Sequence, residues 1–518
     1  MLTRTTASRI LFALLGGFLS SLALPREGIW PLIFVSVALL IYSVRELKTG
    51  PALLVGFVGG LAFYLSQIEW LSLYLGPVPW LALATLEAGI FAIGMAAISR
   101  VWSYLNGLNF GHFKTAIVAL GIAVIWTARE WVSITLPYGG FPWSRLAQTQ
   151  SESPLASWAY WGGLGWLTLV IAWLSTLALL MLVQRGTRAS LAIGLVTSVA
   201  LILVPILTKL DAAPQSGNLV IGSVQGNANA GLFANTKRGS ILENHLSATK
   251  LLAGKPLADE LDLVVWPENA SDLSPFADAV AQQKIRDLVN DELHVPLVFG
   301  TITARGDQLF NSSILWEPGL GATDWYDKKR PVPFAEYVPD RDFWYQLAPD
   351  LIGLISHGYS FGERDGIFET AGTKAGALIC FEIAVDDIGR DLVAQGAQVI
   401  LSQTNNADFG KSDETFQQAA FAKLRAIEAG RTVVNVSTVG VSAVYAPDGQ
   451  VLDALPTFVP GAMVTAVPLR TSITPAMLLG RGVDLWINIL ALVLLALALT
   501  KAQRDKRRSL KNSGEATT

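Results

Sequence analysis

Long apolar segments fill the first 210 residues of the chain, and one more lies near its end. A helix that crosses a bilayer needs about 20 predominantly apolar residues. The segments that meet or approach this requirement are residues 9–25, 28–44, 51–75, 78–98, 115–134, 158–183, 189–208 and 482–500. Arg4 and Arg9 before the first apolar run also fit a cleaved signal peptide. The further segments favour an uncleaved first helix, so we expect about eight spans.

Residues 218–470 show a different pattern, in which short apolar runs alternate with helical stretches that carry charges. Such runs, rich in β-branched residues and bounded by turns, are typical of buried strands. Strands are predicted at residues 219–224, 261–266, 296–301, 313–316, 375–380, 399–402, 433–437 and 441–445. The chain is therefore divided into a membrane domain (1–210, about seven spans), an α/β domain (218–470), a C-terminal span (482–500) and a basic tail (501–518).

Lysine and arginine in short loops predict which way a membrane protein faces, because basic loops stay in the cytoplasm. With eight spans, the basic clusters before span one and after spans two, four, six and eight all fall on one side. That side, including the tail, is predicted to be cytoplasmic. The α/β domain follows seven spans and is therefore expected on the outer face of the membrane.

Composition agrees with a membrane protein and narrows the chemistry. Hydrophobic residues make up 52% of the chain and charged residues 15%, whereas soluble proteins have about 25% charged residues. The net charge of -3 gives no indication of nucleic-acid binding. The four histidines lie far apart and show no metal-ligand spacing, so neither a metal nor a cofactor is expected. Cys380 is the only cysteine, which excludes an internal disulfide.

Three predicted strand ends carry residues suited to catalysis. Glu268 emerges from a buried strand, where desolvation would suit a carboxyl group to proton transfer, although a lone glutamate there is more often a helix cap. Lys328 and Glu336 belong to a proline-rich segment that fits either a rigid loop or a solvated turn. Cys380 lies before a predicted helix at 383–394, whose N-terminus would favour the thiolate. A lone cysteine is otherwise most often an inert buried thiol.

Three motifs in this order carry a family resemblance: Trp266-Pro267-Glu268, the segment from Tyr326-Asp327-Lys328 to Pro339, and Cys380-Phe381-Glu382. They resemble the Glu–Lys–Cys signatures of the nitrilase, or carbon–nitrogen hydrolase, superfamily. Together with the membrane spans, nearly the whole chain resembles the apolipoprotein N-acyltransferase family of bacterial membrane enzymes. The resemblance implies a nitrilase-like α-β-β-α sandwich beside the membrane helices.

The resemblance also implies a reaction. Cys380 would take an acyl chain from a phospholipid as a thioester and pass it to the N-terminal amine of S-diacylglyceryl-cysteine in an apolipoprotein. Glu268 would move the protons, and Lys328 with backbone N–H groups around Phe381 would stabilise the oxyanion. Glu336 and Glu382 would support them. The enzyme would be a monomer in the bacterial cell membrane. Residues expected to touch substrate are Phe141, Trp143 and Phe233, with an interfacial aromatic belt as the alternative for the loop 137–145.

The chain departs from the family pattern at four positions, Asp408, Gln418, Asn435 and Thr438, where tryptophan, histidine, arginine and asparagine are common. These departures leave Glu268, Lys328 and Cys380 intact but put donor preference and acceptor docking in doubt. Two other functions stay open at this point. One is a membrane-bound nitrilase-type amidase that uses water as acceptor, and the other is a non-catalytic lipoprotein-binding scaffold.

Overall fold

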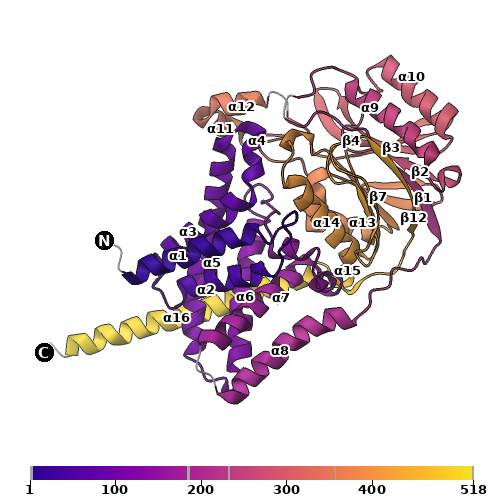
Figure 1. Cartoon of the computed structure of the whole chain (residues 1–518). Coiled ribbons are helices and arrows are strands. Elements are labelled where there is room, and N and C mark those ends of the chain that lie inside the picture. The colour runs from indigo at the N-terminus through magenta and orange to yellow at the C-terminus, as the bar shows by residue number, and fades with distance from the viewer. Residues whose placement is uncertain (1–3, 184–186, 232–233, 356–357, 516–518) are drawn as a thin grey trace.

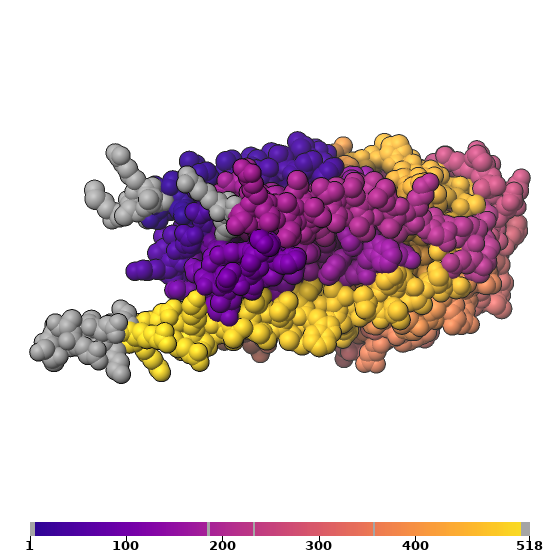
Figure 2. Space-filling view, turned by 90° about the horizontal axis from the view of Figure 1, so that it is seen from below, coloured from indigo at the N-terminus to yellow at the C-terminus, as the bar shows by residue number. Residues whose placement is uncertain are grey.

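The computed structural model describes residues 4–183, 187–231, 234–355 and 358–515. Helices gather at one end of the molecule and two β-sheets at the other (Figure 1). The last helix, α16 (Gly482–Glu515), runs alongside the other membrane helices, as the view from below shows (Figure 2). The chain thus leaves the helical bundle once, forms the sheets, and returns to the bundle.

Among the described residues, six helical segments are long and apolar enough to cross a membrane. They contain α3 (Thr49–Gln67), α5 (Pro77–Asn106), α6 (Lys114–Ser133), α7 (Trp158–Val183), α8 (Arg188–Leu207) and α16. The apolar helices α1 (Arg4–Ser21) and α2 (Leu32–Val44) are shorter. The predicted spans therefore all correspond to helices, and six of them reach membrane-spanning length.

Small residues let the membrane helices approach closely. A Cβ atom on Gly56 of α3 would lie 2.8 Å from the Met95 Cβ of α5. One turn later, a Cβ on Gly60 would lie 3.0 Å from the Ala88 Cα. Larger residues at these positions would push α3 and α5 apart.

The α/β domain contains two six-stranded sheets. The first has the order β12-β1-β2-β3-β4-β5 and the second β11-β10-β9-β8-β7-β6. Neighbouring strands β1, β2 and β3 are parallel, as are β7, β8 and β9. The strands are β1 (Asn218–Gln225), β2 (Leu263–Val265), β3 (Leu297–Arg305), β4 (Gln308–Glu317), β5 (Gly321–Asp327), β6 (Ile367–Thr370), β7 (Thr373–Ile379), β8 (Val399–Thr404), β9 (Thr432–Ser437), β10 (Ala443–Tyr445), β11 (Val451–Ala454) and β12 (Gly461–Pro468).

The sheets face each other between two layers of helices, which confirms the predicted α-β-β-α sandwich. Apolar residues of both sheets, among them Ile221 and Leu401, share one buried cluster. Helices α9 (Ser240–Thr249) and α10 (Ala279–Asp287) cover the outer face of the first sheet. Helices α13 (Asp386–Ala394) and α14 (Glu414–Ala429) cover the second, and their outer sides pack on the membrane bundle.

Buried charged groups join the bundle to the α/β domain. Arg145, in the loop after α6, lies 2.7 Å from the Asp386 carboxylate of α13 and 3.7 Å from the Glu130 carboxylate of α6. Arg425 of α14 donates to Asp386 and to the Ile383 carbonyl, in the turn that follows Cys380. Burial alone would raise the pKa of Asp386, but Arg145 and Arg425 hold it well below its usual range. The turn after Cys380 is therefore tied to the membrane domain through ionised groups.

Candidate active site

Three strand ends meet at one edge of the sandwich. Glu268 follows β2 by three residues, Lys328 comes directly after β5, and Cys380 comes directly after β7. The first two strands belong to one sheet and the third to the other. The α-β-β-α packing therefore brings together side chains that are far apart in the chain, with 60 positions between Glu268 and Lys328 and 52 (380 − 328) between Lys328 and Cys380.

Lys328 lies at the centre of this cluster and is almost fully buried. Its Nζ atom lies 2.9 Å from the Glu336 Oε1 atom and 3.3 Å from the Glu268 Oε1 atom. The Glu336 Oε2 atom also accepts a hydrogen bond from the Val332 N–H, 2.7 Å away. Glu336 therefore orients Lys328 and anchors the proline-rich loop that carries both residues.

Asn311 of β4 is a site residue that the sequence analysis did not identify. Its Nδ2 atom donates to Glu268 at 2.7 Å and to Glu336 at 3.1 Å, and its backbone carbonyl accepts from the Lys328 N–H at 2.8 Å. One amide thus bridges two carboxylates that would otherwise repel each other. The pair Asn311-Ser312 also fits the family resemblance and was the available signal, but the bridging depends on the pairing of β4 with β5.

The charged groups alter each other's pKa values. Burial raises the pKa of Glu268, and the positive charge of Lys328 partly offsets this increase. Burial would lower the pKa of Lys328, but Glu268 and Glu336 raise it well above its usual value, so this ammonium stays charged. A permanently charged lysine beside a carboxyl group of raised pKa is an arrangement suited to oxyanion stabilisation and proton transfer.

The surroundings of Cys380 do not favour the thiolate that the sequence predicted. Its side chain remains partly accessible, but burial and then the Glu268 charge raise the pKa of the thiol well above its usual value, while Lys328 lowers it. The predicted helix at 383–394 is also wrong at its start. A 3-10 turn covers Cys380–Ala384, Val385 is extended, and α13 begins only at Asp386. The resting Cys380 side chain is therefore a protonated thiol.

The backbone at Cys380 adopts the left-handed conformation, with φ at 53°. Residues with a side chain rarely adopt this region, at a cost of about 1–3 kcal/mol, and such residues cluster at functional sites. The turn begins a 3-10 helix at Cys380, and the first N–H groups of a helix have no partner within it. The Phe381 amide is among those first groups, next to the sulfur-bearing residue.

Glu382, the last residue of the motif Cys380-Phe381-Glu382, holds two segments of the site together. Its Oε1 atom accepts from the Tyr326 hydroxyl at 2.8 Å and from the Lys329 N–H at 2.8 Å. Its Oε2 atom accepts from the Ile379 N–H at 2.9 Å. Glu382 thereby connects the end of β7 to the segment that carries Lys328.

Two of the three residues expected to touch substrate lie at the domain boundary. The Trp143 side chain is buried and donates to the Gln417 Oε1 atom of α14 at 2.7 Å. Phe141 stacks on Trp143, with ring centroids 6.4 Å apart, and is half-buried. Their contact with substrate stays a prediction, while their contact with α14 is direct. Phe233 lies outside the described residues.

The four departures from the family pattern have different surroundings. Gln418 donates to the Cys380 sulfur from 3.4 Å, and Thr438 donates to the Glu268 carbonyl from 3.2 Å. Asn435 hydrogen-bonds to Ser402 and the Val441 carbonyl. Burial, then Glu268 and Glu336, raise the pKa of Asp408 to about 6. Two of the four departures, Gln418 and Thr438, therefore contact the candidate catalytic residues, while Asp408 interacts with Glu268 only through its charge.

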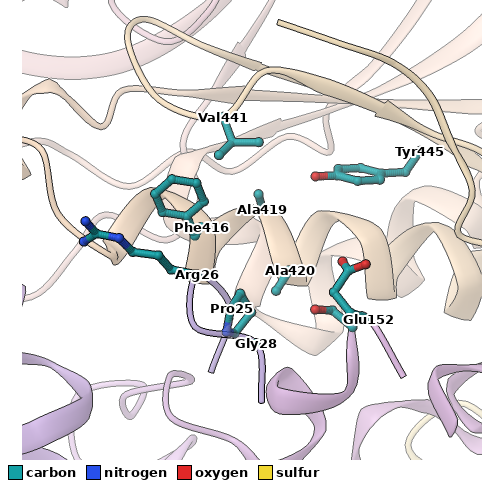
Figure 3. Close-up of a pocket in the computed structure, with 10 residues that line it drawn as sticks. Pro25, Arg26, Gly28, Glu152, Phe416, Ala419, Ala420, Val441 and Tyr445 are labelled. Atoms are coloured by element: carbon teal, nitrogen blue, oxygen red, sulfur yellow. The ribbon is translucent and has the colours of Figure 1, made fainter. Parts of the chain in front are cut away.

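A cavity lies at the domain boundary, lined by residues of both domains (Figure 3). It measures about 320 Å³ and is lined by Arg26, Glu152, Phe416, Ala420 and Tyr445 among others. Phe416 and Ala420, which line the cavity, lie on the side of α14 opposite to Gln418, given 3.6 residues per turn. The cavity thus contains none of Glu268, Lys328 and Cys380. Within the described ranges, no group of three or more His, Cys, Asp or Glu side chains is placed to hold a metal ion.

Known protein families match both the N-terminal membrane helices and the α/β domain of the chain. Residues 16–177 match the family model of the apolipoprotein N-acyltransferase N-terminal domain, and residues 221–474 match that of carbon–nitrogen hydrolases. An apolipoprotein N-acyltransferase of Mycolicibacterium smegmatis is 31% identical, over 97% of this chain and 87% of the relative. One of Azotobacter vinelandii is 29% identical, over 90% of each. A solved amidase of the nitrilase superfamily from Nesterenkonia is 20% identical over 54% of this chain and 99% of its own, with a TM-score of 0.39.

Proposed function

The chain belongs to the apolipoprotein N-acyltransferase family, and from that premise we propose a role for each residue of the candidate active site. The enzyme transfers an acyl chain from a membrane phospholipid to the N-terminal amine of apolipoproteins. The observation that carries the residue assignment is the meeting of Glu268, Lys328 and Cys380 at three strand ends, with Lys328 ion-paired to Glu268.

In the first half-reaction, Glu268 takes the proton of the Cys380 thiol, and the sulfur attacks the ester carbonyl carbon of the phospholipid. The C–S bond forms while the carbonyl oxygen becomes an oxyanion, which the Lys328 ammonium and the Phe381 N–H stabilise. The C–O bond to the glycerol then breaks. Glu268 returns its proton to the departing lysophospholipid oxygen, and an acyl thioester remains on Cys380.

In the second half-reaction, the neutral α-amine of S-diacylglyceryl-cysteine attacks the thioester carbon. The amine proton passes to Glu268, the C–N bond forms, and the C–S bond breaks with its electron pair on sulfur. The proton then returns from Glu268 to Cys380, so the enzyme ends as it began. The ionised Lys328 stabilises the oxyanion of this step as well, and Glu336 and Glu382 act by holding Lys328 and its segment in place.

The enzyme is a bacterial membrane protein, and we further propose that its α/β domain lies on the outer face of the membrane. The placement of lysine and arginine supports this, provided that α1 and α2 cross the membrane and make eight spans. Helix α2 is only about 20 Å long against a hydrocarbon core of about 30 Å, a mismatch that local bilayer thinning accommodates. Since one chain supplies all the proposed catalytic residues, action as a monomer is also proposed.

The test is to incubate the purified full chain with a phospholipid that carries a labelled acyl chain, and then to measure its intact mass. An adduct of one acyl chain is expected on the wild-type protein and not on the Cys380→Ser variant, and a diacylated lipopeptide should discharge it as N-acylated peptide. Release of free fatty acid without N-acylated peptide would instead identify a hydrolase. Turnover that survives Cys380→Ser would contradict the thioester mechanism.

A further inference from the structure

The Cys380 sulfur has a hydrogen-bond donor that the proposed mechanism does not use. Gln418 lies on α14, is almost fully buried, and points its Nε2 atom at the Cys380 Sγ atom from 3.4 Å. An N–H group that faces sulfur interacts much more strongly with a thiolate than with a thiol, because a charged acceptor strengthens the bond. The question is whether this amide is held with its nitrogen, and not its oxygen, toward the sulfur.

Asn406 decides the orientation of the Gln418 amide. The Asn406 Nδ2 atom donates to the Gln418 Oε1 atom at 2.6 Å. A flipped Gln418 would turn its NH₂ group toward that donor, so that two N–H groups face each other and the hydrogen bond from Asn406 is lost. The Gln418 nitrogen is therefore the atom that faces Cys380, as long as Asn406 itself is held in one orientation.

Hydroxyl groups fix the orientation of Asn406. The Ser437 hydroxyl accepts from the Gly440 N–H, so its own hydrogen is available for the Asn406 Oδ1 atom, 2.5 Å away. The Thr415 hydroxyl likewise accepts from a backbone N–H and donates to the same oxygen at 3.2 Å. Gly440 leaves the space that this arrangement needs, because a Cβ there would lie 2.4 Å from the Asn406 Oδ1 atom. The Oδ1 atom of Asn406 is thus the acceptor, and its Nδ2 atom must face the other way.

A buried carboxyl group completes the arrangement. The Glu414 Oε2 atom accepts from the Asn406 Nδ2 atom at 2.8 Å. Glu414 and Gln418 are four residues apart on α14 and so lie on the same face of the helix. Both hydrogens of the Asn406 amide therefore have an acceptor, one on Glu414 and one on Gln418. Asn406, Glu414 and Gln418 are each 2% exposed, which removes water as a competing partner.

We propose that Gln418 is a further catalytic residue, whose amide N–H stabilises negative charge on the Cys380 sulfur, and that Asn406 and Glu414 are positioning residues that aim it. The inference rests on the proposed role of Cys380 as the nucleophile. The charge appears twice in each cycle. It forms when Glu268 removes the thiol proton, and it forms again when the C–S bond of the thioester breaks and leaves its electron pair on sulfur. Gln418 acts in both events without exchanging a proton.

The test measures the thiolate directly and does not depend on acyl transfer. Cys380 is the only cysteine, so intact mass after iodoacetamide treatment reports its alkylation alone. For the purified full chain, the alkylation rate should rise with pH through a midpoint that is set by the pKa of the Cys380 thiol. Gln418→Met keeps the size of the side chain but removes the N–H, and should move this midpoint upward by about one pH unit, with acyl transfer reduced about tenfold. Asn406→Ala should cause a smaller shift in the same direction.

Gln417→Met is the matched control, because it removes the neighbouring amide, which contacts the membrane domain and not the sulfur. It should lower thermal stability but leave the alkylation midpoint where it is. The proposal is overturned if Gln418→Met leaves the midpoint unchanged, or if Gln417→Met moves it equally. If the chain forms no acyl adduct but its alkylation midpoint still depends on Gln418, the thioester mechanism is wrong while the Gln418 contact stands. Failure of the proposed function and failure of this inference can therefore be told apart.

Discussion

Gln417 and Gln418 are neighbours on α14, and their side chains bind different halves of the molecule. The Gln417 Oε1 atom accepts from the indole N–H groups of Trp70 and Trp143, at 3.0 and 2.7 Å. The Gln418 Nε2 atom faces the sulfur of Cys380. Successive residues of a helix point about 100° apart, so one turn of α14 contacts both the membrane domain and the nucleophile. Helix α14 thus joins the candidate active site to the membrane domain.

The first prediction concerns this contact. Trp143→Phe keeps an aromatic ring against Phe421 but removes the N–H that Gln417 accepts. The loss of one buried hydrogen bond costs about 1 kcal/mol, so the apparent unfolding temperature should fall by a few degrees, and acyl transfer should fall by about two- to fivefold as the contact between the membrane domain and the α/β domain weakens. Trp325→Phe, at an exposed position of β5, should change neither value. Equal effects of the two substitutions would contradict a special role for the Trp143 contact.

The second prediction follows from the raised pKa of the nucleophile. Burial and the Glu268 charge both raise the pKa of Cys380. Glu268→Gln removes that charge, so the midpoint of alkylation against pH should move down, although acyl transfer should fall by about a hundredfold or more with loss of the base. Glu243→Gln, on the exposed face of α9, should alter neither. An unchanged midpoint in Glu268→Gln would mean that Glu268 does not lie close enough to act on the thiol.

The third prediction concerns stability against pH. Burial raises the pKa of Glu414 to about 8 in the folded protein, from an ordinary value of 4.5. The unfolded chain therefore loses this proton at a lower pH than the folded protein does. The stability that protonated Glu414 gives the folded protein is fully present below pH 4.5 and is lost as pH rises toward 8. Each unit of pKa difference is worth about 1.4 kcal/mol. The apparent unfolding temperature should thus fall between pH 5 and pH 8, and less steeply in Glu414→Gln. Glu369→Gln, whose side chain is 76% exposed, should reproduce the wild-type curve.

The sheets show what a local pattern can and cannot predict. All eight predicted strands are present, and the strands that the pattern missed, β5, β6, β11 and β12, are the outer strands of the two sheets. An outer strand has a neighbour on one side only, so its sequence carries less of the buried, β-branched signal. In β5, for example, Tyr326 is buried while Trp325 is exposed. Strand β12 is the exception, because most of its residues are buried.

The site was predictable where its residues follow strands and carry family motifs, as Glu268, Lys328 and Cys380 do. What the sequence could not show are contacts that depend on packing. Asn311 reaches Glu268 because β4 pairs with β5. Gln418 reaches Cys380 across 38 positions of the chain. The expected thiolate was wrong for a similar reason: Val385 separates Cys380 from α13, and the surrounding protein outweighs any help from a helix terminus.

The last prediction tests which side of the membrane holds the α/β domain. Cys380→Ser removes the only cysteine, so a single new cysteine can report topology. Leu320, in the turn between β4 and β5, is 74% exposed. In the Cys380→Ser background, Leu320→Cys should react with a membrane-impermeant maleimide on intact cells.

Gln503→Cys, at an exposed position of the basic tail, is the matched control in the same background. The proposed eight spans place this tail in the cytoplasm, on the opposite side from Leu320, because the positive-inside rule assigns the basic clusters to that side. Gln503→Cys should therefore react only after the membrane is permeabilised. The reverse pattern would place the α/β domain in the cytoplasm. If both cysteines reacted on intact cells, the two positions would share the outer side, and the span between them, α16, would not cross the membrane.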